Sequence, residues 1–357
     1  MTEPAAAPER QIPPRRWQWW IACLTVVLVV AGAALWSRQS VTAPPLAPPS
    51  VAEVPQPGAT PALPVTGVFI EPGDGRAPIL DEIQGARRSI DLEVYLVSDD
   101  AILRSLEEAQ RRGVGVRVIL EEHPFGGGGG QEEVFARLAS TGIAVRWGNP
   151  AFRFSHIKTM IVDDAVAVIM NQNLTQSAFS SNREFGVVTT RPDAVQTAAA
   201  IFGADWSRGA EPDPGPLVVS PTNARAQLLA LMDGARVSLD LYAEVLRDPQ
   251  LLDALAAAAE RGVRVRIIVS PSGDFGAEVD ALAASGVDVR FSRSLYIHAK
   301  LIVADGERAY VGSQNLSATS LDQNRELGIV VDDPVNLSRL SRTFAIDFRA
   351  AASLERP

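Results

Sequence analysis

Hydrophobic positions divide the chain into an apolar N-terminal segment, a proline-rich stretch and a long region of strand-like and helix-like periods. From residue 17 to residue 36 the chain is almost wholly apolar, with Gln18 and Thr25 as its clearly polar members. Twenty residues of helix extend about 30 Å, the thickness of a bilayer core, and tryptophans at both ends suit the two membrane interfaces. The pattern therefore predicts a transmembrane signal anchor over residues 17–36.

The charges around this segment predict its orientation. Three arginines precede it and one follows closely, Arg10, Arg15 and Arg16 against Arg38. The excess of positive charge keeps residues 1–16 in the cytoplasm and exports the rest. We expect a single-pass protein of the cell membrane whose main domain is extracytoplasmic. The alternative is a signal peptide cleaved near residues 31–34, which would give a secreted protein.

Prolines dominate the stretch that follows, residues 37–65. Because proline lacks a backbone donor and has a fixed φ, we expect an extended linker there.

The remainder of the chain contains one pattern twice. Residues 68–120 match residues 217–269 at a constant offset of 149. Each copy has a strand-like run, a helix-period run and a second strand-like run, at 89–97, 101–112 and 114–120 and again at 238–246, 250–261 and 263–269. Strand, helix and strand in this order indicate a βαβ crossover. We predict an α/β fold with two duplicated α/β/α half-domains, 66–212 and 213–357, whose largely parallel sheets pack about a pseudo-two-fold axis.

Composition narrows the chemistry. The 357 residues carry a net charge of -9, which argues against broad binding of duplex nucleic acid. The single cysteine, Cys23, excludes an intramolecular disulfide and a cysteine metal cluster. The chain has only two lysines, Lys158 and Lys300, and each stands two residues after a histidine.

Those lysines belong to a motif that occurs in both copies. The first copy reads HIKTMIVDD, MNQN and NREFG, and the second reads HAKLIVADG, GSQN and NRELG. Here the sequence resembles the phospholipase D superfamily, whose signature is H-x-K-x4-D-x6-G-S-x-N. The first copy departs from it, because Met170-Asn171 replaces the Gly-Ser pair that Gly312-Ser313 keeps. Asn171 can still donate and accept hydrogen bonds, so we expect a changed pocket shape with activity retained.

The spacing of the motif has a physical meaning. Residues two apart on a strand face the same side, so each copy presents an imidazole and an ammonium together. Two such faces form a pocket suited to an anionic phosphodiester and its transition state. No cluster of carboxylates or of cysteine and histidine indicates a metal. We therefore expect no metal and no cofactor. The two lysines would stabilise the negative charge of the phosphodiester, as Mg²⁺ does in metal-dependent enzymes.

The resemblance implies a role for each motif residue. One histidine attacks phosphorus to form a phosphohistidine and the other protonates the leaving alcohol; by family analogy these are His156 and His298. Glu184 and Glu326, each 28 residues after its own histidine, would orient the imidazoles. Asp163 and Asp305 end the motif, where a structural role is expected. The phosphoryl oxygens would be held by Lys158, Lys300, Asn173 and Asn315.

Aromatic residues precede each motif and are predicted to reach the pocket mouth. Phe152, Phe154 and Tyr296 are candidate substrate-binding residues, together with Ser313 and Asn171. The sequence thus predicts a phospholipase D-type phosphodiesterase that hydrolyses or transphosphatidylates phospholipids. The alternatives are a metal-independent endonuclease of the same superfamily, in which case the partner is nucleic acid, and a cardiolipin synthase.

Overall fold

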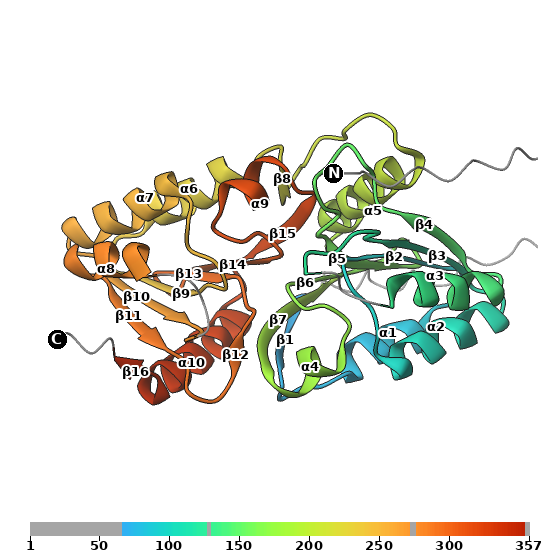
Figure 1. Ribbon diagram of the computed structural model, residues 1–357, viewed down its shortest axis with the longest axis horizontal. Helices are drawn as coiled ribbons and strands as arrows, with labels where there is room; N and C mark the ends of the chain where they lie inside the picture. The colour runs from blue at the N-terminus through green and yellow to red at the C-terminus, as the bar shows by residue number, and fades with distance from the viewer. Residues whose placement is uncertain (1–65, 127–129, 272–275, 354–357) are drawn as a thin grey trace, which may run out of the picture. The chain divides into compact units, whose positions relative to one another are not determined.

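Two mixed β-sheets, one from each copy, form the core of the computed structural model, which describes residues 66–126, 130–271 and 276–353 (Figure 1). The predicted cytoplasmic segment 1–16, signal anchor 17–36 and linker 37–65 lie outside these residues. Within the described ranges, no helix combines the length and apolarity that crossing a membrane requires.

The first sheet has the strand order β1-β7-β6-β5-β2-β3-β4. Its strands are β1 (Thr66–Glu71), β2 (Ser89–Val94), β3 (Gly115–Leu120), β4 (Ala144–Trp147), β5 (Lys158–Val162), β6 (Val166–Met170) and β7 (Asn182–Thr189). The helices of this copy are α1 (Ala77–Gly85), α2 (Asp100–Arg111), α3 (Gln131–Ser140), α4 (Gln176–Ser180) and α5 (Pro192–Ser207).

The second sheet repeats the arrangement in the order β16-β11-β10-β9-β13-β14-β15-β8. Its strands are β8 (Leu217–Ser220), β9 (Ser238–Tyr242), β10 (Arg264–Val269), β11 (Asp288–Phe291), β13 (Leu301–Ala304), β14 (Arg308–Gly312), β15 (Glu326–Val331) and β16 (Ala352–Ser353). The helices are α6 (Ala224–Gly234), α7 (Pro249–Glu260), α8 (Gly276–Ala284), α9 (Ala318–Asp322) and α10 (Pro334–Ala350). The two copies therefore share one order of elements, as predicted.

The prediction of largely parallel sheets is wrong. The crossovers give the parallel pairs β2–β3 and β3–β4, and likewise β9–β10 and β10–β11. The chain then returns as an antiparallel meander, β5–β6–β7 in one copy and β13–β14–β15 in the other. Tight turns allow this return, and Asp163 and Asp305 adopt a positive φ of 55° at the ends of β5 and β13.

Helices cover the sheets in layers. Figure 1 shows α1, α2 and α3 along one face of the first sheet and α6, α7 and α8 along one face of the second. Each of these outer layers has its own apolar core. The opposite faces of the two sheets contribute to one shared core, together with α5 and α10. Burial of that shared surface holds the copies against each other.

Helix boundaries follow the expected local signals. Asp99 caps α2 by accepting from the backbone N–H groups of Ala101 and Ile102. Gly113 and Gly262 follow α2 and α7 with φ of 90° and 88°, a conformation that glycine adopts without strain.

Backbone pairing between the copies positions the motif. The short strand β12 (Tyr296–Ile297) of the second copy pairs in parallel with the start of β7, so that Tyr296 lies opposite Asn182. Reciprocally, Ser155 bridges Arg325, and His156 N donates to the Arg325 carbonyl at 2.8 Å. The segment leading into each His-x-Lys pair therefore runs beside the Asn-Arg-Glu segment of the other copy.

Candidate active site

The two histidines are held by glutamates from opposite copies. His156 Nδ1 lies 2.8 Å from Glu326 Oε2, and His298 Nδ1 lies 2.9 Å from Glu184 Oε2. The inter-copy pairing produces this exchange, because continuing the register of β12 along β7 brings His298 to Glu184. Both glutamates are fully buried. Each histidine therefore binds, through Nδ1, the motif glutamate of the other copy and not the one that follows it in its own copy.

The glutamates are themselves fixed. Glu326 Oε1 accepts from the Ser320 hydroxyl at 2.6 Å and from Asn324 Nδ2 at 3.0 Å. Glu184 Oε1 accepts from Asn182 Nδ2 at 3.1 Å. Each carboxylate therefore has one oxygen bound within its own copy and the other directed at the imidazole across the interface.

Each lysine is buried beside its histidine. Lys158 Nζ donates to the His156 carbonyl at 2.7 Å, and Lys300 Nζ donates to the His298 carbonyl at 2.6 Å. Each ammonium group is therefore held in place by a charge-assisted hydrogen bond to the backbone. The structure brings the four motif side chains to one inter-copy region.

The copies differ at one position next to these lysines. Tyr95 in the first copy corresponds to Glu244 in the second at the offset of 149. Lys158 Nζ lies over the Tyr95 ring at 4.9 Å, and that ring packs edge-on against His156 at 4.5 Å. In the second copy, Glu244 Oε2 lies 2.5 Å from Lys300 Nζ and 3.7 Å from His298 Nε2. One half of the site is therefore aromatic and the other carries an extra carboxylate.

This difference affects protonation. Burial, together with the Lys158 and Lys300 cations, lowers the pKa of His156 to about 4 despite Glu326. Burial and the Lys300 cation lower the pKa of Lys158 to about 7. A neutral His156 donates Nδ1–H to Glu326 and keeps the lone pair on Nε2.

Two carboxylates of the site, Glu326 and Glu244, stay ionised. Burial opposes ionisation of Glu326, but His156 and Lys158 hold its pKa below the usual range. Burial likewise opposes ionisation of Glu244, and the charges of His298 and Lys300 outweigh it, so the pKa of Glu244 is also lowered. The site therefore keeps anionic partners for its cations at neutral pH.

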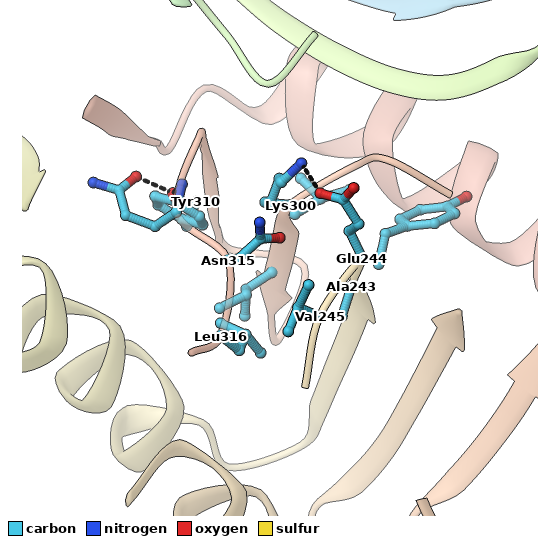
Figure 2. A pocket seen from close by; sticks show the side chains of 11 residues that line it. Ala243, Glu244, Val245, Lys300, Tyr310, Asn315 and Leu316 are labelled. Atoms are coloured by element: carbon cyan, nitrogen blue, oxygen red, sulfur yellow. Dashed lines mark hydrogen bonds and ion pairs between the residues drawn. The ribbon is translucent and has the colours of Figure 1, made fainter. Parts of the chain in front are cut away.

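Asn315 lines a pocket with Glu244 and Lys300 (Figure 2). The Oδ1 atoms of Asn173 and Asn315 are buried and have no hydrogen-bond partner in the part of the chain that the structure describes. Such an oxygen is costly to leave unpaired, so each Oδ1 is available to accept a hydrogen bond from a ligand.

Asn171 and Ser313, which were predicted to bind substrate, directly follow β6 and β14. Both side chains are fully buried and bind backbone at equivalent places. Asn171 Oδ1 accepts from Phe185 N at 2.8 Å, and Ser313 Oγ accepts from Leu327 N at 3.1 Å. These contacts hold the backbone of β7 and β15. Asn171 Nδ2 is buried and has no partner among the residues that the structure describes, so a substrate contact of Asn171 or Ser313 stays a prediction.

The Met170 departure has a packing explanation. A Cβ on Gly312 would lie 2.3 Å from the Tyr310 hydroxyl oxygen. Tyr310 corresponds to Val168 in the first copy at the offset of 142, and the smaller valine leaves room for Met170. The copy with the smaller residue at this position, Val168, is thus the one that carries the larger Met170.

The motif aspartates lie at turns. Asp163 accepts from the backbone N–H groups of residues 87, 88 and 89, and Asp305 accepts from those of residues 236, 237 and 238. Burial opposes ionisation, but these bonds hold the pKa of each carboxyl below its usual range. Their contacts tie the turn after β5 or β13 to the start of β2 or β9.

The aromatic residues that were predicted to reach the pocket mouth divide into two groups. Phe154 packs edge-on against Tyr95 at 6.0 Å, and the Tyr296 hydroxyl donates to Glu244 Oε1 at 3.3 Å. These two therefore adjoin the site. Phe152 instead lies against the Arg325 guanidinium at 5.1 Å.

A second reciprocal set of contacts surrounds the site. Arg325 donates to Asp205 of the first copy at 2.8 Å, and Arg183 donates to Asp347 of the second copy at 2.7 Å. Arg325 is completely buried. The motif arginines thus bind across the interface, as the adjoining glutamates do.

Sequence reasoning missed three features of this region: Glu244, Tyr95 and the exchange of glutamates. The offset of 149 already aligned Tyr95 with Glu244 beside the strand ends, which is the signal that could have found them. Among the described residues, no cluster of His, Cys, Asp and Glu side chains has the arrangement of a metal site.

The fold and this duplicated His-Lys-Glu arrangement define a phospholipase D-like protein. The family described as "Cardiolipin synthase, PLD-like domain" matches residues 79–206 and 228–348. Because these stretches exceed half of the chain, the protein belongs to this family, and the resemblance seen in the sequence is confirmed.

Comparisons with individual proteins give related sequences and the same fold. A cardiolipin synthase of Geobacillus kaustophilus is 26% identical over 340 residues, covering 81% of this chain and 67% of the relative. A polyphosphate kinase of Porphyromonas gingivalis superposes with a TM-score of 0.64 at 17% identity, covering 82% of this chain and 52% of that one. A phosphatidylserine synthase of Haemophilus influenzae gives 0.63 at 14% identity, covering 80% and 87%. At these identities the two structures support the fold alone.

Proposed function

We propose that this protein transfers the phosphatidyl group of a phospholipid, through a phosphohistidine on His156, to an alcohol or to water. One observation carries the proposal: two His-x-Lys pairs meet between the copies, and each imidazole is held at Nδ1 by a buried glutamate. That leaves Nε2 of each ring for chemistry at phosphorus.

The reaction divides into two steps. Nε2 of His156 attacks phosphorus, the bond from phosphorus to the head-group oxygen breaks, and protonated His298 gives that oxygen its proton. In the second step His298 takes a proton from the acceptor hydroxyl, whose oxygen attacks phosphorus and releases His156. The ammonium groups of the lysines and the amide N–H groups of Asn173 and Asn315 would donate hydrogen bonds to the phosphoryl oxygens.

Electrostatics supports this division of roles. The low pKa of His156 keeps it neutral and nucleophilic at pH 7. Glu244 Oε2 lies 3.7 Å from His298 Nε2, so a carboxylate stands beside the reactive nitrogen on that side. No carboxylate takes the corresponding place in the first copy, where Tyr95 stands. The asymmetry of the site thus favours His156 as nucleophile and His298 as acid.

Transfer to an alcohol is favoured over simple hydrolysis. Several relatives with matched sequence are named cardiolipin synthases, and the synthesis of cardiolipin by phosphatidyl transfer needs an alcohol as acceptor. This supports the cardiolipin synthase alternative of the sequence analysis. With phosphatidylglycerol as acceptor, the same two steps would give cardiolipin.

A lipid substrate is supported by an exposed aromatic side chain beside the site. Phe125 is 84% exposed, and its backbone N–H donates to the Tyr95 hydroxyl at 2.6 Å. Tyr95 in turn contacts His156. A phenylalanine so placed can insert into the interfacial region of a bilayer while a head group reaches the pocket.

Turnover by the purified full-length protein would test the proposal, with EDTA present, on mixed phospholipid vesicles and on single-stranded DNA in parallel. We expect release or exchange of a lipid head group, lost in His156→Ala. DNA cleavage without lipid turnover would instead support the endonuclease alternative.

A diester with a p-nitrophenolate leaving group separates the roles of the histidines. This leaving group departs without a proton, so His298→Ala should still show a burst of p-nitrophenolate, whereas His156→Ala should show none. The opposite result would exchange the two assignments.

A further inference from the structure

Glu244 places a carboxylate at the reactive nitrogen of His298, where the first copy has Tyr95. Figure 2 shows the Glu244 side chain directed toward Lys300, and the two are joined at 2.5 Å. The role of this carboxylate is not given by the two His-x-Lys motifs, because Glu244 belongs to neither.

Glu244 has acceptor capacity left. Oε2 binds the Lys300 ammonium, while Oε1 accepts the Tyr296 hydroxyl at 3.3 Å, which is long for a bond between oxygens. An ionised carboxylate has about four lone-pair sites. The Glu244 side chain is 19% exposed and Tyr296 is 44% exposed, so this edge of the site opens to solvent.

The proton transfer at His298 determines which part of the substrate lies next to Glu244. In the proposed function, His298 Nε2 exchanges a proton with the leaving and accepting alcohols, so the alcohol oxygen must lie within hydrogen-bond reach of it. A substituent one or two carbons from that oxygen then falls near Glu244, 3.7 Å from the same nitrogen.

We propose that Glu244 and Tyr296 form the subsite for the alcohol side of the phosphodiester, and that Glu244 selects an alcohol carrying a second hydrogen-bond donor, a hydroxyl or an ammonium group. The inference rests on the proposed function and adds to it a preference at the alcohol position. Lys300 and His298 keep the carboxylate ionised, so it acts as an acceptor. The opposite side, with Tyr95 and Phe154, is left for the apolar part of the substrate.

Partitioning of the phosphoryl enzyme among acceptors tests this subsite without any lipid. The full-length protein is given a p-nitrophenyl phosphodiester with glycerol, ethanolamine or 1-propanol, and the ratio of transfer to hydrolysis is measured for each. The wild-type protein should favour glycerol and ethanolamine over 1-propanol.

Two variants separate the sources of the preference. Glu244→Leu removes every acceptor atom and should lower both preferences about 10- to 100-fold, the usual effect of losing a hydrogen bond to a charged group. Glu244→Gln keeps a neutral acceptor, so it should weaken the preference for ethanolamine more than that for glycerol.

A matched carboxylate serves as control. Glu107 has a 14% exposed side chain and an ion pair of 2.5 Å with Arg137, between α2 and α3. Glu107→Gln should partition like the wild-type protein.

Several results would overturn the inference. They are a wild-type protein that does not discriminate among the acceptors, a Glu244→Leu variant with unchanged ratios, and a variant that loses transfer and hydrolysis equally. The last would mean that Glu244 only positions Lys300. Acceptor selection with the chromogenic diester, but no head-group release from vesicles, would contradict the proposed function while supporting the subsite.

Discussion

Glu326 of the second copy holds the imidazole of His156 in the first copy at 2.8 Å, across 170 residues of sequence. The reciprocal pair has nearly the same length, so neither half supplies the carboxylate that binds Nδ1 of its own histidine. Folding of both copies is therefore needed before either histidine has its tautomer fixed.

A double-mutant cycle on the free energy of unfolding should detect this exchange. We expect His156→Ala and Glu326→Leu to be non-additive by about 0.5–3 kcal/mol, since they remove the two partners of one buried bond. His156→Ala combined with Glu184→Leu should be close to additive. Urea unfolding of the six proteins gives both couplings, and a larger coupling to Glu184 would contradict the exchange.

Activity should depend on pH with two limbs. Protonation of His156 removes its lone pair, so kcat/KM should fall as the pH drops through about 4. Deprotonation of Lys158 removes a positive charge from the phosphate site, so kcat/KM should also fall as the pH rises through about 7. Steady-state rates on the p-nitrophenyl diester would give this profile.

Lys158→Arg distinguishes the source of the alkaline limb. Arginine keeps its charge throughout this range, so the limb should move well above pH 7 even if the rate is reduced. An unchanged limb in this variant would assign it to another group.

Gly312 should not tolerate a side chain. A Cβ there would lie 2.3 Å from the Tyr310 hydroxyl oxygen and 2.5 Å from Gly328 Cα, so Gly312→Ala should destabilise the protein by about 1–3 kcal/mol. Adding Tyr310→Val, which copies the first half, should relieve part of that loss. Thermal unfolding measures both effects, with Gly234→Ala as control because no heavy atom lies within 4 Å of its Cβ.

Phe125 should matter only at a lipid surface. Phe125→Ala should lower turnover on phospholipid vesicles about 10-fold, because it removes part of the apolar area that enters the interface. Its rate on the soluble p-nitrophenyl diester should match the wild-type rate. Val335→Ala, at a 78% exposed residue of α10, is the control for loss of exposed apolar surface. Equal losses on both substrates would contradict an interfacial role.

Much of the fold could be read from local patterns. The predicted helices at 101–112 and 250–261 correspond to α2 (Asp100–Arg111) and α7 (Pro249–Glu260). Capping residues and helical periods are local signals, which explains their accuracy. The antiparallel return through β5, β6 and β7 was missed, because strand direction depends on turns that the hydrophobic pattern does not encode.

The site shows a similar limit. Repeat comparison identified His156, Lys158 and Glu184 as equivalent to His298, Lys300 and Glu326. The equivalence of these residues does not say whether a histidine contacts the glutamate of its own copy or that of the other copy. The exchange of glutamates followed only from the pairing of β12 with β7. Asn171 is another example: its place in the motif indicated the pocket, whereas its bond to Phe185 N belongs to the sheet.

The difference between Tyr95 and Glu244 has a consequence for how such a site can evolve. Two identical subunits related by a two-fold axis would carry every substitution twice, so a carboxylate introduced beside one histidine would appear beside the other as well. With both copies encoded in tandem on one polypeptide, each can mutate alone. The tandem arrangement thereby allows one half to present an aromatic wall and the other an acid, a difference between the halves that symmetry forbids to a homodimer.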